Sequence, residues 1–321
     1  MADSYGHTSE SRAAAWLAAA RGLRHEAWGE ALAGYLFIGP AVVLFFLFNA
    51  WPVLRGLSIA FSDYRYLIPN HQPFNGIDNW LEMGRDPDFW ASLGRSVEYT
   101  VVYVLLNFVL AFLAAVLISQ ILRQREAAIY RVMAYLPVVL PVAIAMLVWR
   151  QLLNPEFGYA AYALKQLFGK AAPDLLRDPA WALPSLAVAA SWKTMGTNVL
   201  LLLVGLYNIN QELYEAAAID GAGWWSRLRH VTMPLLRPTF TIVFVLAAGI
   251  LGDVEPSLIF FGVTDRGPQD AGLLVGRYAY ETAFRLGDLR WGYAAAMNLT
   301  VGLISMAMSA VVFRALRSGR V

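Results

Sequence analysis

The chain has 321 residues, of which 58% are hydrophobic and only 15% are charged, and its formal net charge is +2. A soluble domain has about 25% charged residues, so the composition argues against a soluble protein, and the small net charge gives no indication of nucleic-acid binding. The chain has no cysteine, which excludes disulfides, thiolate metal sites and cysteine nucleophiles, and its four histidines lack the spacing of a metal site.

Residues 1–30 are predicted to form a cytoplasmic N-terminal tail. They are polar at first and then amphipathic, with tryptophan, leucine and arginine. Two interpretations stay open, an interfacial helix on the membrane surface and a frayed tail. The apolar run Ala13–Ala20 is too short for a signal peptide and is followed by charged residues instead of a cleavage site. The first span is therefore expected to act as an uncleaved anchor.

Four intervals contain no charged residue and approach or exceed the roughly 20 apolar residues that cross a bilayer. They are Ala31–Leu54, Tyr99–Leu122, Val132–Trp149 and Trp291–Phe313. We predict a membrane span in each.

Two long polar segments separate these spans, at residues 55–98 and 150–179. The first is rich in tryptophan and proline, which predicts a folded lobe rather than a simple connection. Within the third span, Pro137 and Pro141 lie four residues apart. Such a pair predicts a bent helix that faces protein or a cavity.

Two further spans are predicted at residues 184–208 and 238–263, although ionisable residues interrupt both. Lys193 lies about 15 residues before the end of the first, and Asp253 about 15 residues into the second, which is ~22 Å along a helix in each case. Because buried charges in membranes usually pair or line a polar pathway, we hypothesise that Lys193 faces Asp253, with Glu255 nearby. The alternative is that all three snorkel to the outer headgroups. Pro256 predicts a helix break at Glu255.

Polar residues also occur inside the predicted spans. Interhelical hydrogen bonds are the expected role of Asn107, Ser119, Asn198 and Asn298. Trp149 and Trp192 are expected to anchor span ends at the membrane interface. The candidates for a solute pathway are Lys193, Thr194, Thr197, Asn198, Asp253, Glu255 and Asn298.

An ordered polar insert at residues 212–237 connects the fourth and fifth spans. Leu213–Ile219 is predicted to form a short helix, Gly221 a turn, and the residues from Trp224 a second short helix that ends near Pro234. From periodicity alone, an ordinary helical hairpin on the membrane surface explains the insert equally well.

The orientation follows from basic residues. Six spans would put both termini, the 123–131 turn and the insert on the same side of the membrane. These segments are shorter in total than the segments on the other side, yet each side holds twelve Lys and Arg residues. Because short basic loops stay cytoplasmic, we predict that both termini and the insert are inside.

The insert resembles the EAA loop of ABC-importer permeases. The Glu-Ala-Ala of residues 215–217, Gly221 and Pro234 match that motif, with Val231 and Met233 as mild departures. Other stretches are similar to carbohydrate-type permeases of the maltose or glycerol-3-phosphate kind, so that the likeness covers almost everything after residue 30. They are Leu36–Tyr64, Phe74–Trp90, Tyr130–Gly158 and Thr264–Pro268, the last with Asp265 and Arg266 in place of smaller residues.

The resemblance implies an all-α fold with six transmembrane helices, the MetI-like fold of type I ABC-importer permeases, over residues 31–321. It also implies partners: a second permease chain, identical or homologous, two ATP-binding cassette subunits, and an external solute-binding protein that meets the two polar lobes. The complex would lie in the inner membrane of a prokaryote. The EAA loop would be a coupling helix seated on the ATPase, and the docking residues would be Glu215, Ala216, Ala217, Asp220 and Gly221.

The solute is not decided by the resemblance, because sugars, polyols and glycerol phosphates all fit it. In related sugar permeases spans 4 and 5 line the solute site, and charge at Lys193, Asp253 and Glu255 departs from a neutral lining. A charged or amino-bearing solute is therefore one of the open alternatives.

The chain has no ATP site of its own in sequence. The single Gly-Lys pair, Gly169-Lys170, is followed by Ala171, and Leu164 stands where a phosphate-binding loop needs its first glycine. We therefore expect no enzyme activity, no metal and no bound cofactor in this chain, with ATP and Mg²⁺ used by the partner ATPase. The alternatives are an ion-coupled secondary transporter and a membrane enzyme with Asp253 and Glu255 as an acid pair, although no nucleophile or metal set accompanies them.

Overall fold

A computed structural model of the chain describes residues 34–68, 70, 72–169 and 172–317. The predicted N-terminal tail, residues 1–30, lies outside the described residues. The chain divides into two compact units, residues 1–58 and 59–321. The boundary predicted from the sequence was placed at residue 30, and the first predicted span, Ala31–Leu54, lies within the first of these two units.

The described part of the first unit is helical. One continuous helix, Gly34–Ala60, includes the π-turn η1 (Phe46–Ala50) and α2 (Trp51–Ala60). Its length and apolar character satisfy what a bilayer requires. It ends six residues beyond the predicted limit of Leu54.

The described part of the second unit is also helical, and its strand pairing is limited to two isolated bridges, Ser62 with Phe74 and Arg65 with Arg290. Its elements are α3 (Asp78–Met83), α4 (Pro87–Ser119), α5 (Gln124–Val139), α6 (Val142–Leu152), α7 (Tyr159–Phe168), α8 (Pro179–Tyr207), α9 (Gln211–Ile219), α10 (Trp224–Arg227), the π-turn η3 (Leu228–Thr232), α11 (Met233–Leu235), α12 (Arg237–Ala248), the 3-10 turn η4 (Gly249–Gly252), α13 (Glu255–Phe261), the 3-10 turn η5 (Pro268–Asp270), α14 (Val275–Phe284) and α15 (Trp291–Arg317).

Four described helices are long and apolar enough to cross a membrane, and two bent helix pairs bring the number to six if each pair is one span. The third span is the pair α5 and α6, which meet at 97° between Val139 and Val142. The bend predicted from Pro137 and Pro141 is confirmed. Pro137 lies inside α5, whereas Pro141 immediately precedes α6, where its missing N–H leaves no internal hydrogen bond unmade.

The second and fourth spans begin earlier than predicted, at an Asp-Pro pair in each case. The Asp86 side chain accepts a hydrogen bond from the Asp88 N–H at 2.9 Å, and Asp178 accepts one from the Ala180 N–H at 2.9 Å. The following proline occupies the first turn, which suits its fixed φ. The charge-free interval underestimates the second span because its first turns carry Asp88, Arg95 and Glu98. The fourth span begins five residues before its predicted start at residue 184.

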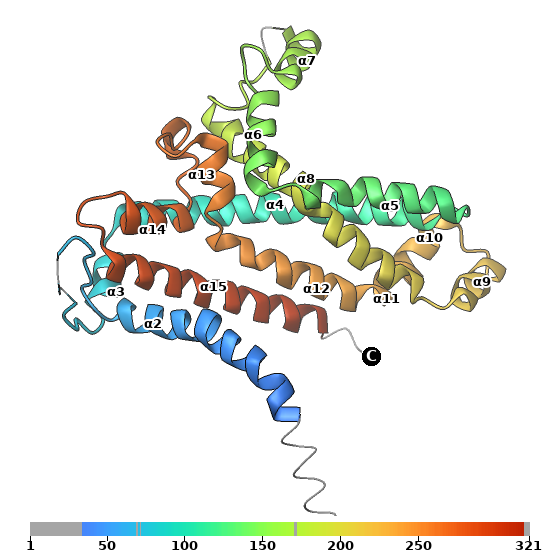
Figure 1. The fold of residues 1–321 in the computed structure, drawn as a ribbon. Helices are drawn as coiled ribbons and strands as arrows, with labels where there is room; N and C mark the ends of the chain where they lie inside the picture. Colours follow the sequence, from blue (N-terminus) through green and yellow to red (C-terminus); the bar gives the residue numbers. More distant parts are fainter. Residues whose placement is uncertain (1–33, 69, 71, 170–171, 318–321) are drawn as a thin grey trace, which may run out of the picture. The chain divides into compact units, whose positions relative to one another are not determined.

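Helix α8 is the centre of the second unit. Half of its most apolar 18-residue window is buried, against 6% for α15, and α8 packs on α4, α5 and α6 (Figure 1). Glycine permits the closest approaches: a Cβ on Gly196 would lie 2.4 Å from the Ala134 carbonyl oxygen of α5, and one on Gly205 would lie 2.5 Å from Thr239 Oγ1 of α12. Figure 1 shows α9 at one end of this bundle and α3 and α14 at the other.

Candidate functional site

The insert between spans 4 and 5 starts with α9, whose ends are both capped. Asn210 Oδ1 accepts a hydrogen bond from the Glu212 N–H at 3.1 Å. At the other end the Gly221 N–H bonds the Ala218 oxygen at 3.0 Å and the Ala222 N–H bonds the Ala217 oxygen at 2.9 Å. Gly221 has φ +78°. This is the Schellman arrangement that favours glycine, so the predicted helix and the predicted turn at Gly221 are both confirmed.

None of the residues of α9 is buried. Four of the five predicted docking residues are exposed, Ala217 being half-buried: the exposed ones are Glu215, Ala216, Asp220 and Gly221. Ile219, on the same short helix, exposes 88% of its surface. A capped, rigid helix with small residues and an exposed isoleucine has the character of a docking surface.

The other face of α9 is joined to the start of span 5. The hydroxyls of Tyr214 and Thr232 lie 2.9 Å apart, and the buried Thr232 also donates to the Arg227 oxygen at 3.4 Å. The π-turn η3 provides the spacing for this second bond, since Thr232 lies five residues after Arg227. After α11, the fully buried Leu236 anchors the chain, and α12 departs at 66°. A side-chain hydrogen bond therefore joins α9 to the segment that leads into span 5.

Span 5 is interrupted near its far end. After α12 and η4 the backbone becomes extended at Asp253, and α13 begins at Glu255. The break comes two residues before the predicted position, and Pro256 starts the new helix instead of ending the old one. The side chains of Asp253 and Glu255 are exposed.

Lys193 has a different partner from the predicted one. Its Nζ donates a hydrogen bond to the Val138 carbonyl oxygen at 3.1 Å. That carbonyl belongs to the last turn of α5, where the bend in span 3 removes the usual helical donor. No ion pair joins Lys193 to Asp253 or Glu255 in the part of the chain that the structure describes. Lys193 therefore caps a broken helix.

A buried polar network links α4 to α8. Asn107 Oδ1 accepts from Asn198 Nδ2 at 2.6 Å, and Asn107 Nδ2 donates to Thr194 Oγ1 at 2.9 Å. The Tyr103 hydroxyl lies 2.8 Å from the same Thr194 oxygen. The interhelical role predicted for Asn107 and Asn198 is confirmed, whereas Ser119 bonds the Val116 oxygen of its own helix, so its prediction was wrong.

The seven pathway candidates thus separate into two groups. Lys193, Thr194 and Asn198 are engaged between helices, while four others are exposed: Thr197, Asp253, Glu255 and Asn298. Trp149 and Trp192 pack edge to face with centroids 5.8 Å apart, within the apolar surroundings of α6 and α8.

An ionic cluster at the opposite end of the bundle from α9 was missed from the sequence. Arg277 is fully buried, donates to Glu281 Oε1 at 2.8 Å, and binds the carbonyl oxygens of Gly262 and Asp265 at 2.9 Å each. Arg266 donates to Glu281 Oε2 at 2.6 Å. The Arg266 that departs from the family pattern thus has a structural partner. The signal was the i, i+4 spacing of Arg277 and Glu281 on one helix.

Asp86 joins three helices at this same end. Its Oδ2 accepts hydrogen bonds from the hydroxyls of Tyr278 at 2.8 Å and Tyr293 at 2.6 Å, while Oδ1 caps α4. Burial raises the pKa of Asp86, but the hydrogen bonds from the two tyrosines and from the backbone outweigh it, so its net pKa is lowered.

Acidification is expected to loosen this junction. Because the folded-state pKa of Asp86 lies below its unfolded value, its stabilisation is present above the unfolded value, ~3.9, and is lost as the pH falls through the folded one. Asp86→Asn keeps a capping side chain and should flatten the pH dependence of the apparent Tm of the purified chain below pH 5. Identical pH profiles for the variant and the natural chain would contradict the assignment.

The fold defines a class of protein, a polytopic helical membrane component, and in this chain the short, exposed helix α9 lies between two of the spans. Residues 107–317, more than half of the chain, match the model of the family described as binding-protein-dependent transport system inner membrane component. The chain belongs to this family, and is therefore a multi-pass membrane transport component and not itself an enzyme.

Curated relatives match nearly the whole chain. The lactose transport system permease protein LacF of Rhizobium radiobacter is 28% identical, over 88% of this chain and 94% of the relative. The trehalose/maltose transport system permease protein MalF of Thermococcus litoralis is 28% identical, over 89% of this chain and 94% of the relative. The structure of a bacterial ABC transporter involved in the import of the acidic polysaccharide alginate matches with a TM-score of 0.76 at 21% identity. The match covers 92% of this chain and 100% of the chain in that structure. These matches confirm the predicted all-α, MetI-like permease fold.

Proposed function

We propose that the chain is a permease subunit of an ATP-driven carbohydrate importer, working with a second permease, two ATP-binding cassette subunits and an external solute-binding protein. The observation that carries the proposal is the family match together with α9, an exposed, doubly capped helix bonded to the start of span 5 through Tyr214 and Thr232. We infer from the distribution of basic residues that both termini and α9 lie in the cytoplasm.

The carbohydrate class rests on the relatives. The names of several relatives specify lactose, trehalose and maltose, or arabinooligosaccharides as the transported solutes. The exposed side chains of Thr197, Asp253, Glu255 and Asn298 are polar groups at positions where a sugar could exchange hydrogen bonds. The two acids favour a solute with hydroxyl or amino donors over an anionic one.

The energy source is assigned to the partner ATPase. ATP and Mg²⁺ would bind there, and closure of the ATPase pair would push on α9 and rock spans 4 and 5, opening the pathway alternately to each side. The proposed docking residues are Glu215, Ala216, Ala217, Asp220 and Gly221, which lie on or directly after this helix.

Uptake driven by this mechanism is expected to be sensitive to vanadate and insensitive to collapse of the ion gradient. The measurement is uptake of candidate sugars by proteoliposomes that contain the purified complex, with the co-purifying subunits identified by mass spectrometry. An ion-coupled transporter would show the reverse sensitivities, and uptake by this chain without any ATPase subunit would overturn the proposal.

A further inference from the structure

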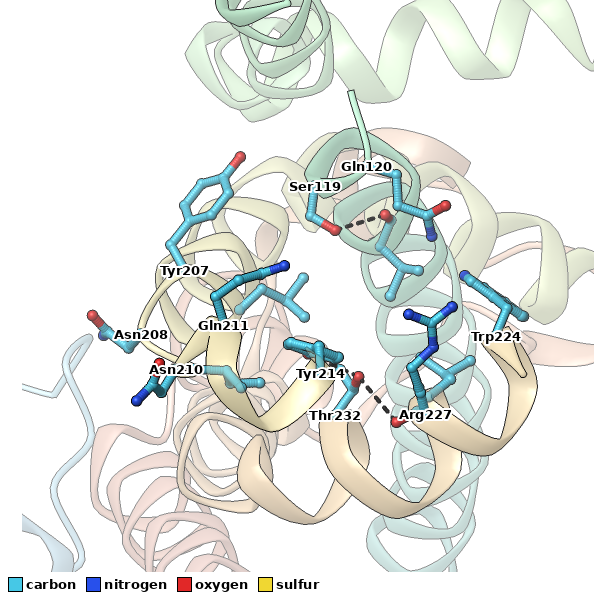
Figure 2. A pocket seen from close by; sticks show the side chains of 14 residues that line it. Ser119, Gln120, Tyr207, Asn208, Asn210, Gln211, Tyr214, Trp224, Arg227 and Thr232 are labelled. Carbon is cyan, nitrogen blue, oxygen red and sulfur yellow. Dashed lines mark hydrogen bonds between the residues drawn. The ribbon is translucent and has the colours of Figure 1, made fainter. Parts of the chain in front are cut away.

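A cavity of about 660 Å³ lies behind the docking helix, between the insert and the ends of spans 2 and 4 (Figure 2). Its walls come from the ends of α4 and α8, from α9 and from α10. We propose that this cavity binds the phosphate-bearing headgroup of an anionic membrane phospholipid.

One formal charge, a positive one, lines the described part of the cavity. Arg227 is the one cation among the described residues that line it, and no described acid lines it. Figure 2 shows the Arg227 guanidinium pointing into the space between Gln120 and Tyr214. No ion pair of this guanidinium is found in the described residues, so its charge is available to an anion. Arginine matches phosphate oxygens with paired N–H donors.

The rest of the lining fits a glycerol-phosphate headgroup. Gln120 and Gln211 provide amide donors and acceptors in the lining, and Val116 and Leu206 contribute apolar surface. A phosphate bound by Arg227 would therefore leave its glycerol and first acyl carbons near aliphatic side chains. Apolar surface beside a cationic group distinguishes this cavity from a site for a small soluble anion.

The position of the cavity favours a lipid. It lies at the ends of α4 and α8, which reach the inner headgroup layer if the proposed topology holds. Trp224 lines it, and Trp224 and Trp225 expose 49% and 67% of their surfaces. Tryptophan is enriched at membrane interfaces, and basic pockets between transmembrane helices bind anionic headgroups.

Lipid binding and docking use different faces of α9. Gln211 and Tyr214 line the cavity, but Glu215, Ile219 and Asp220 do not. A bound headgroup would contact the ends of α4 and α8 on one side and α10 on the other, and would brace the insert against the bundle without covering the docking face.

The test compares the lipids retained by purified full-length variants from membranes of mixed phosphatidylglycerol and phosphatidylcholine. Arg227→Gln removes the charge in the cavity, and Arg229→Gln removes the same charge from an exposed residue outside it. We expect native mass spectrometry to show at least a fivefold loss of bound phosphatidylglycerol for Arg227→Gln and little change for Arg229→Gln. Equal retention by the two variants would overturn the proposal.

A second variant guards against misfolding. Gln120 is exposed at the cavity wall, and Gln120→Glu adds a repelling charge there without altering the core. It should also lose phosphatidylglycerol, while Arg227→Lys should retain most of it.

Competition with soluble glycerol phosphate, added at millimolar concentration, distinguishes a lipid headgroup from a free phosphate as the occupant. Retention of the lipid supports the headgroup site. Complete displacement of the lipid would show a site for soluble phosphates and overturn the lipid assignment.

Discussion

Gly221→Pro is expected to reduce transport at least tenfold while the chain still inserts and folds. Gly221 has φ +78°, which the proline ring excludes, and its N–H donates to the Ala218 oxygen at 3.0 Å. The substitution therefore destroys the turn that ends α9 and reorients the proposed docking face. Loss of a few kcal/mol at a docking contact corresponds to more than a tenfold loss of affinity. ATP-dependent uptake by proteoliposomes measures the effect.

Gly223→Pro is the matched control. Gly223 lies two residues further on, has φ −67° and precedes α10, so proline fits its backbone and the helix start. A Cβ at Gly221 or at Gly223 would meet no atom within 4 Å, so the two sites differ in backbone conformation and not in crowding. Normal transport by Gly221→Pro would show that this turn does not couple the chain to an ATPase.

The parts of the fold that follow from periodicity and local chemistry were predictable. The spans follow from continuous apolar runs of about 20 residues. The bend at Pro137 and Pro141, the helix after Asn210 and the turn at Gly221 each depend on residues within one or two helical turns. The early start of span 2 was also readable, because Asp86-Pro87 is a helix-start signal. A search for charge-free intervals overlooks such a start, since it discards every turn that carries a charge.

The fate of the ionisable residues was not predictable in the same way. Counting residues gives the depth of Lys193 and Asp253 along their helices but not the direction in which each side chain points around the axis. The structure directs Lys193 to α5, and the break after η4 places Asp253 on extended backbone. Likewise, the contact of Arg266 with Glu281 spans 15 residues across a loop, and no local pattern determines such a pairing.

Lys193→Met is expected to destabilise the purified chain by about 1.5–3 kcal/mol, the usual contribution of a hydrogen bond to a charged group. The substitution leaves the Val138 carbonyl at the end of α5 without its donor, and the bend of span 3 loses one polar contact with α8. Uptake should fall as well, because the bend is then held to α8 by packing alone. Lys165→Met is the control: Lys165 also donates to a carbonyl, that of Pro155, but it is exposed, so its loss should cost under about 0.5 kcal/mol.

A double variant that combines Lys193→Met with Asp253→Asn distinguishes a capping role of Lys193 from an ion pair between Lys193 and Asp253. If Lys193 acts on Val138 and Asp253 acts elsewhere, the two destabilisations add within about 0.5 kcal/mol, as they do for independent sites. If the two side chains formed a buried ion pair, each single variant would leave an unpaired charge, and the second substitution would restore part of the loss. The measurement is the apparent free energy of unfolding, in one detergent, of the natural chain, the two single variants and the double variant. If the double variant is more stable than additivity predicts by over about 1 kcal/mol, Lys193 and Asp253 form the ion pair predicted from their depth, and the capping assignment is wrong.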